Sequence, residues 1–292
     1  MAIDFNPSAQ TRLLGSFKRS FGSEYDRFPP NAYSAPGGGS GYHLANQMFG
    51  SVDAEILYSM IRKFKPKRII EIGSGWTTML MVQATAVNRD EGVESTIISV
   101  DPAGKDGQHA TNAWCTAKRL QDTPDVLDDL HEGDFLVIDS SHVFVDGNEI
   151  DLALKKMASL FGVYVHFHDI FLPDDYPEAW DHRHYDEQTH IERFLEEHAD
   201  WSVLLAANYL HVNEKPLLAA TFKSYDRDPP IGPGSFWMFR AQAEGLSSPA
   251  ETSVTADATV EPDPAAPHTF MSDRSGKKCI LCGKTTRAKV HK

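Results

Sequence analysis

Cysteine is scarce in this sequence. The 292 residues include three, Cys115, Cys279 and Cys282. An odd and sparse set does not make the disulfide framework of a small secreted protein, which favours a reducing compartment. No stretch approaches the roughly 18 consecutive apolar residues of a membrane-spanning helix, and residues 1–20 lack the apolar run of a secretory signal. We therefore expect a soluble, cytoplasmic protein with no membrane contact.

Basic charge is also in short supply. The chain has 28 Lys and Arg against 41 Asp and Glu, a formal net charge of −13. Such an acidic chain does not present the general basic face that nucleic-acid binding requires. The hydrophobic fraction of 41% is enough for a sizeable core. A small molecule is therefore the expected partner, and self-association into a homo-oligomer stays open.

Apolar runs typical of strands alternate with helical patterns from residue 53 to residue 241. Continuous apolar strands separated by helices indicate a parallel sheet that is covered on both faces. We therefore predict a doubly wound, Rossmann-like α/β domain over 53–241. The expected strands are 68–73, 95–101, 134–141, 162–169, 201–210 and 235–241, and the expected helices are 53–65, 77–87, 109–120, 148–161 and 189–199.

The two flanks differ from this central domain. Residues 1–52 are rich in Gly, Pro, Ser and Asn, and we expect a partly irregular segment with one short helix that lies over a site or against a neighbour. Residues 242–275 have few bulky apolar groups and read as a disordered linker. The basic tail 276–292 carries Cys279-x-x-Cys282, which is half of a zinc site. A flexible tail with two free thiols, or a redox role, are the alternatives.

The segment Glu71-Ile-Gly73-Ser74-Gly75 lies where the first expected strand meets a helix. Glycines in such a turn let the backbone approach a ligand closely, and the helix N-terminus points at that ligand. Asp101 ends the next strand, where an acid can bind a ribose diol. The pattern indicates a nucleotide-type ligand, although a tight turn that needs glycine only for its geometry is the alternative.

The third position of a dinucleotide fingerprint, which requires Gly or Ala, is occupied here by Thr78. The acid-x-Gly-x-Gly pattern instead resembles motif I of class I S-adenosylmethionine-dependent methyltransferases, and the resemblance extends over residues 42–240. It implies a seven-stranded sheet whose antiparallel edge comes from 201–210 and 235–241. It also implies that S-adenosylmethionine is held by five residues, Glu71, Gly73, Ser74, Gly75 and Asp101.

Acids and histidines close two further expected strands. Asp139 and His142 follow the strand at 134–141, and His168 and Asp169 end the strand at 162–169. Ligands of open α/β sheets bind beyond the carboxyl ends of the strands, so we expect these four side chains to form one catalytic cluster. It is suited either to binding a divalent cation or to general-base catalysis near neutral pH.

The layout of these two strand ends also resembles the macrocin-type sugar O-methyltransferases, in which acids at these positions hold a divalent metal. The resemblance implies that Asp139, His168 and Asp169 bind Mg²⁺ or another divalent ion. The expected function is methyl transfer from S-adenosylmethionine to a small molecule, at a hydroxyl group. The alternatives are a non-catalytic cofactor-binding protein, an NAD(P)-dependent oxidoreductase and a metal-dependent hydrolase.

Overall fold

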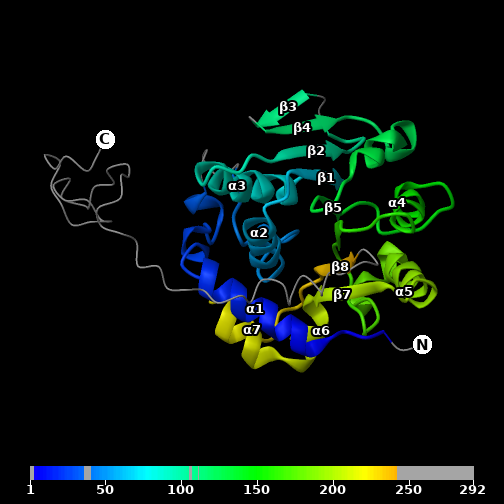
Figure 1. Cartoon of the computed structure of the whole chain (residues 1–292). Helices are drawn as coiled ribbons and strands as arrows, with labels where there is room; N and C mark the ends of the chain where they lie inside the picture. Colours follow the sequence, from blue (N-terminus) through cyan, green and yellow to red (C-terminus); the bar gives the residue numbers. More distant parts are fainter. Residues whose placement is uncertain (1–2, 36–40, 105–106, 111, 242–292) are drawn as a thin grey trace, which may run out of the picture. The chain divides into compact units, whose positions relative to one another are not determined.

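The computed structural model describes residues 3–35, 41–104, 107–110 and 112–241. The predicted linker 242–275 and the tail 276–292, with Cys279 and Cys282, lie outside the described residues. Eight strands form one sheet in the order β3-β4-β2-β1-β5-β6-β8-β7 (Figure 1). The strands are β1 Arg68–Ile72, β2 Thr96–Val100, β3 Gly107–Ala110, β4 Ala113–Thr116, β5 Phe135–Ile138, β6 Tyr164–Phe167, β7 Trp201–Ala206 and β8 Phe236–Arg240.

The sheet confirms the predicted Rossmann-like α/β class. Strands β4, β2, β1, β5 and β6 pair in parallel, while β8 runs antiparallel between β6 and β7. Seven strands therefore follow the expected arrangement. The eighth strand, β3, is four residues long and pairs antiparallel with β4 at the other end of the sheet. The carboxyl ends of β1, β2, β5 and β6 consequently meet at one edge, as the sequence predicts.

The prediction of a helix over 109–120 is wrong, because the end of β3 and the whole of β4 lie in this segment. Ala113 and Cys115 are buried, whereas Trp114 between them is 42% exposed. This alternation has the two-residue period of a strand. Parallel pairing with β2, from Ile97 opposite Ala113 to Val100 opposite Thr116, stabilises the strand. Tertiary pairing therefore overrides the weak helical pattern of the segment.

The helices pack in two groups around the sheet. One core contains buried residues of α1, α2 and α3 on one face, and the other contains buried residues of α4 and α5 on the opposite face (Figure 1). The predicted strand over 201–210 is shorter than expected, because β7 ends at Ala206 and α6 begins at the next residue. The helices are α1 Pro7–Phe21, α2 Asp53–Phe64, α3 Trp76–Asp90, α4 Glu149–Met157, α5 Glu187–Glu197, α6 Ala207–Asn213 and α7 Lys215–Thr221, with short 3-10 turns at Tyr25–Arg27, Ala32–Ser34, Leu120–Asp122, Pro124–Asp129 and Glu178–Arg183.

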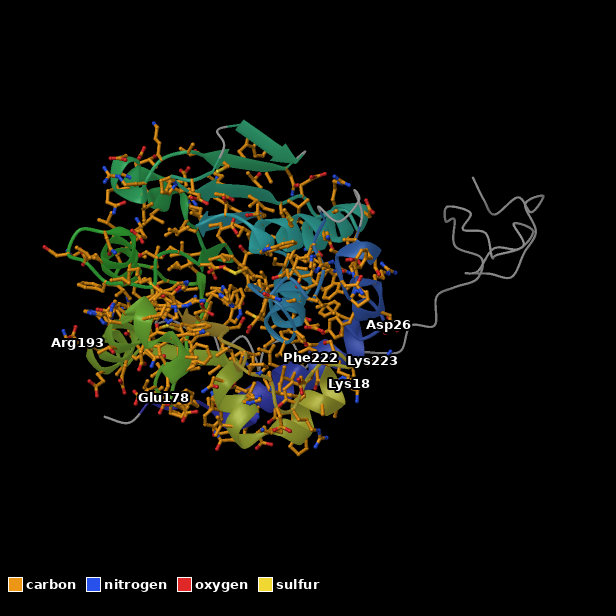
Figure 2. The ribbon with its side chains drawn as sticks, turned by 180° about the vertical axis from the view of Figure 1, so that it is seen from behind. Lys18, Asp26, Glu178, Arg193, Phe222 and Lys223 are labelled. Atoms are coloured by element: carbon orange, nitrogen blue, oxygen red, sulfur yellow. The ribbon has the colours of Figure 1, made fainter. Side chains whose placement is uncertain are left out.

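The N-terminal segment contributes more order than the sequence indicates. Its helix α1 is 15 residues long, not short, and Leu14 and Phe17 are completely buried. The side chain of Gln10 accepts a hydrogen bond of 2.9 Å from the backbone N–H of Ala206 at the end of β7. Near the end of α7, Lys223 pairs with Asp26 at 2.7 Å (Figure 2). Among the described helices, none is long and apolar enough to cross a membrane.

Candidate active site

The glycine turn after β1 brings two strand ends into contact. Gly73 has a φ of 93°, and a Cβ at this position would lie 1.9 Å from the carbonyl oxygen of Asp139. No residue with a side chain fits there, because the conformation and the contact both exclude it. A Cβ on Gly75 would meet no atom within 4 Å. The first glycine is thus required by packing against the end of β5, while the second leaves open space for a ligand.

Glu71 lies beneath the turn and does not line the cleft described below. Its carboxylate is completely buried and accepts hydrogen bonds of 2.6 Å from Thr77 and from Thr78, and a third from Ser99. Burial raises the pKa of Glu71 to about 7, although the three hydroxyl groups oppose this effect. The carboxylate therefore holds the start of α3 against β1 and β2, and its hydrogen bonds are made within the chain.

Asp101 faces the same turn from the end of β2. Its Oδ2 accepts hydrogen bonds from the backbone N–H of Ser74, at 3.0 Å, and from the Ser74 hydroxyl, at 2.6 Å. Its Oδ1 accepts a bond of 2.8 Å from the N–H of Ala103. These bonds hold the carboxylate at the mouth of the turn. Gly73, Ser74 and Asp101 are thereby brought together, as the sequence predicts.

A cleft of about 390 Å³ opens beyond these strand ends. This volume lies within the range of about 300–1,000 Å³ that is typical of small-ligand sites. Gln121 lines it with a buried side-chain oxygen that has no hydrogen-bond partner. The cleft is lined by Ile72, Gly73, Ser74, Val100, Asp101, Pro102, Arg119, Leu120, Gln121, Asp139, Ser140, Ser141 and Glu149.

Asp139 connects the cleft to the predicted cluster of histidines and acids. Its Oδ1 lies 3.6 Å from His142 Nε2 and 3.3 Å from His168 Nδ1. The Asp169 carboxylate lies opposite, with Oδ2 at 3.7 Å from His142 Nε2 and Oδ1 at 3.5 Å from His168 Nδ1. All four side chains predicted from the two strand ends therefore come together. We call Asp139, His142, His168 and Asp169 the His/Asp cluster.

Two further carboxylates lie behind the histidines, and the sequence alone does not reveal them. Glu187, at the start of α5, is completely buried, and its Oε2 lies 2.9 Å from Nδ1 of His142. Asp53, at the start of α2, has its Oδ2 3.6 Å from Nε2 of His168. It also accepts backbone hydrogen bonds from Gly234 and Ser235 at 3.1 and 2.7 Å. Both residues begin helices that are far in sequence from the two strand ends, so no local pattern relates them to the cluster.

The contacts within the cluster shift its pKa values. Burial opposes the charge of His142, but the contacts with Asp139 and Glu187 outweigh burial and raise its pKa to about 10. His168 is also buried, and the neighbouring Asp169 and Asp139 carboxylates raise its pKa well above 6.5. Burial would raise the pKa of Asp139, yet the two imidazoles lower it. Burial raises the pKa of Asp169 despite the same imidazoles. The contacts with the carboxylates thus favour the protonated form of both imidazoles.

The cluster has more acids than bases. Within the described part of the chain, the ion pairs of Asp53, Asp139, Asp169 and Glu187 are all with histidine. Four carboxylates around two imidazoles leave two negative charges when all six groups are charged. His168 Nδ1 is buried and has no hydrogen-bond partner of proper geometry. No three His, Cys, Asp or Glu side chains of the described residues already have the geometry of a metal site, so binding a cation requires side-chain adjustments.

Aromatic side chains border the cluster on two sides. The Phe49 ring lies 4.7 Å from the His168 ring, and the Tyr185 ring lies 4.7 Å from the His142 ring. Tyr185 belongs to the segment 171–188 that follows β6, in which Trp180 packs on Phe171. Residues from the N-terminal segment and from the loop after β6 thus cover the two histidines.

Comparison with known proteins agrees with this arrangement. Residues 70–170 match the family model described as a methyltransferase domain, a range that includes the glycine turn, Asp101 and the His/Asp cluster. No curated protein matches the chain.

Two solved structures are similar to part of this chain. One is titled "cmcI-D160 Mg-SAM" and is 14% identical, with a TM-score of 0.40 over 66% of this chain and 73% of that chain. The other, a SAM dependent methyltransferase from Archaeoglobus fulgidus, is 16% identical, with a TM-score of 0.37 over 66% of this chain and 95% of that chain. The match to a methyltransferase domain therefore covers residues 70–170, the part of the chain that holds the glycine turn, Asp101 and the His/Asp cluster.

Proposed function

We propose that the chain transfers the methyl group of S-adenosylmethionine to a hydroxyl group of a small molecule, with a divalent cation bound in the His/Asp cluster. The observation that carries the proposal is the position of Asp139. It lines the cleft beside the glycine turn and also contacts both histidines of the cluster. A methyl donor in the cleft and an acceptor at the cluster would therefore lie on two sides of one residue.

In and beside the cleft, the chain offers partners for the ribose and the adenine of the cofactor. The open space at Gly75 admits a ligand close to the backbone at the start of α3. The Asp101 carboxylate can accept hydrogen bonds from a ribose diol if it exchanges its bonds with Ser74. The unpartnered oxygen of Gln121 can accept a bond from the amino group of adenine.

At the cluster, the charges favour a cation over a histidine base. With a pKa of about 10, His142 already holds a proton at neutral pH and cannot remove one from an acceptor. The orphaned Nδ1 of His168 and the two excess negative charges fit a divalent ion. Such an ion, when bound, lowers the pKa of a coordinated hydroxyl group. Asp139, His142, His168 and Asp169 would hold it, and Phe49 and Tyr185 would exclude water.

The test follows production of S-adenosylhomocysteine from S-adenosylmethionine with a panel of small hydroxyl compounds, including sugars and phenols. We expect turnover with at least one compound, loss of turnover with a chelator, and recovery when a divalent metal is added back. Calorimetry should detect binding of S-adenosylmethionine and none of NADH. Turnover that a chelator does not change would contradict the role of the cation, and failure of the cofactor to bind would contradict the whole proposal.

A further inference from the structure

The kind of cation that the His/Asp cluster takes can be inferred from its donor atoms. Four donors face inward: Nε2 of His142, Nδ1 of His168 and carboxylate oxygens of Asp139 and Asp169. Imidazole nitrogens suit Zn²⁺, Fe²⁺ and similar ions, whereas Mg²⁺ prefers oxygen ligands throughout. Half of this donor set is therefore of the wrong chemistry for Mg²⁺.

The two outer carboxylates determine which nitrogen of each ring faces inward. Glu187 Oε2 lies 2.9 Å from His142 Nδ1, so that nitrogen carries a proton and Nε2 is left for a cation. Asp53 Oδ2 lies on the Nε2 side of His168, which leaves Nδ1 facing Asp139 and Asp169. A carboxylate behind a ligating histidine fixes the tautomer of the ring and makes its inner nitrogen more basic. The two residues begin different helices, α5 and α2.

The inner donors would have to move to bind one ion. The four nitrogen-to-oxygen separations are 3.6, 3.7, 3.3 and 3.5 Å, and Asp169 faces the two histidines with different oxygens, Oδ2 for His142 and Oδ1 for His168. The chemistry of the donors, and not their present spacing, therefore carries the distinction between the cations.

We propose that the His/Asp cluster selects a transition metal of the Zn²⁺, Fe²⁺ and Co²⁺ type over Mg²⁺, and that Glu187 and Asp53 position His142 and His168 for it. This inference rests on the proposed function and specifies the cation of that site.

The experiment measures binding of Co²⁺ alone and of Mg²⁺ alone to the full chain, by calorimetry and, for Co²⁺, by its visible absorption. All proteins carry Cys279→Ser and Cys282→Ser, so that thiols of the tail do not contribute. We expect one Co²⁺ per chain and at least about 100-fold weaker binding of Mg²⁺. His168→Asp replaces an imidazole by a carboxylate, and should reduce or reverse this preference.

The positioning role is tested by Glu187→Gln and Asp53→Asn. Each should weaken Co²⁺ binding by about 10- to 100-fold and shift its absorption spectrum, since the ring it supports loses its fixed tautomer. His131→Gln, which changes an exposed histidine away from the cluster, is the matched control and should have no effect. Binding of S-adenosylmethionine at wild-type strength shows that a variant is folded.

The outcomes separate this inference from the proposed function. Equal affinity for Mg²⁺ and Co²⁺, or a preference unchanged by His168→Asp, overturns the selectivity while leaving the methyl transfer intact. Wild-type Co²⁺ spectra in both Glu187→Gln and Asp53→Asn overturn the positioning role. Absence of any bound metal overturns the selectivity together with the proposed cation, whereas turnover without metal would still support the methyltransferase.

Discussion

The glycine turn and the His/Asp cluster lie on neighbouring strand ends but satisfy their charges differently. Beneath the turn, the buried Glu71 carboxylate receives hydrogen bonds from three hydroxyl groups of the chain. In the cluster, the ion pairs that the described residues show for Asp139 and Asp169 are with histidines, and His168 Nδ1 has no hydrogen-bond partner among those residues. Buried polar groups are normally paired, so a bound ligand would account for a buried group that has no partner in the chain.

This difference separates a residue that stabilises the fold from residues that we propose to bind a cation. Glu71 was expected to contact the cofactor, yet its hydrogen bonds stabilise the turn itself. Asp139 and Asp169 face each other across two imidazoles, in a region where carboxylates outnumber imidazoles. Complete burial together with hydrogen bonds to the chain therefore distinguishes Glu71 from Asp139 and Asp169, and mutations should affect them in different ways.

The largest effect is expected from Asp139→Asn and Asp169→Asn. Each keeps the shape of the side chain and removes a charge from the cluster. Turnover should fall by more than about 100-fold, because losing an inner ligand should cost at least as much as losing an outer one. Binding of S-adenosylmethionine, measured by calorimetry, should stay within a few-fold of wild type. Wild-type turnover in both variants would remove the functional difference between the two regions.

Gly73→Ala should break the contact between the two regions. The new Cβ would meet the Asp139 carbonyl oxygen at a positive φ, and we expect a loss of roughly 3 kcal/mol or more of unfolding free energy. Gly75→Ala is the matched control, because its Cβ meets no atom. Gly75→Ala should keep the thermal stability of the wild type and should instead weaken binding of the cofactor. Equal stability of both alanine variants in urea unfolding would argue against the close contact.

Glu71 should make stability depend on pH. Its pKa is 4.5 without burial and about 7 in the folded chain, so the folded state holds the proton more tightly. This contribution is fully present below about pH 4.5 and is lost as the pH rises through about 7, by at most about 3 kcal/mol.

Urea unfolding of Glu71→Gln between pH 5 and 8 should therefore show a shallower fall in stability than the wild type. Glu55, a second buried acid with a pKa of about 7, provides the comparison, and Glu55→Gln should remove a separate share of the slope. An unchanged slope in Glu71→Gln would mean that its carboxylate does not titrate in this range.

The smallest effect is expected from Asp101→Ala. Loss of an acceptor for the ribose diol should weaken binding of S-adenosylmethionine by about 1.5–3 kcal/mol, or roughly 10- to 150-fold in affinity. The packing of Gly73 on Asp139 and the hydrogen bonds of Glu71 still hold the turn, so the melting temperature should change little. Calorimetric affinity equal to that of the wild type, in a folded variant, would show that the cofactor is held without Asp101.

The alternating pattern of the sequence predicts the class of the sheet and the strand ends that form the site. It does so because hydrophobic runs and the glycines between them are local signals. Pairing between distant segments is not local. The strands β3 and β4 are stabilised by neighbours in the sheet, and the helical pattern of 109–120 gave no indication of this.

The same limit applies to the site. His142 and His168 follow recognisable strands, so their proximity could be predicted from the topology alone. Glu187, at the start of α5, is 45 residues away from His142 in the sequence. Asp53, at the start of α2, precedes the glycine turn, whereas His168 follows it. Gln121 follows the predicted helix 109–120 and belongs to no pattern identified in the sequence. Residues that come together only through the tertiary fold have no characteristic spacing in the sequence from which their contact could be predicted.

The contact between Gly73 and Asp139 has a consequence for the geometry of the reaction. Methyl transfer requires the acceptor oxygen, the methyl carbon and the sulfur to lie nearly in line. The oxygen must be about 3–3.5 Å from the methyl carbon before the bond forms. If the sulfur is held at the turn and the oxygen at the cluster, their separation depends on how closely β1 and β5 approach. The absent side chain of Gly73 sets that approach, so a residue without a side chain would fix the distance over which the proposed transfer takes place.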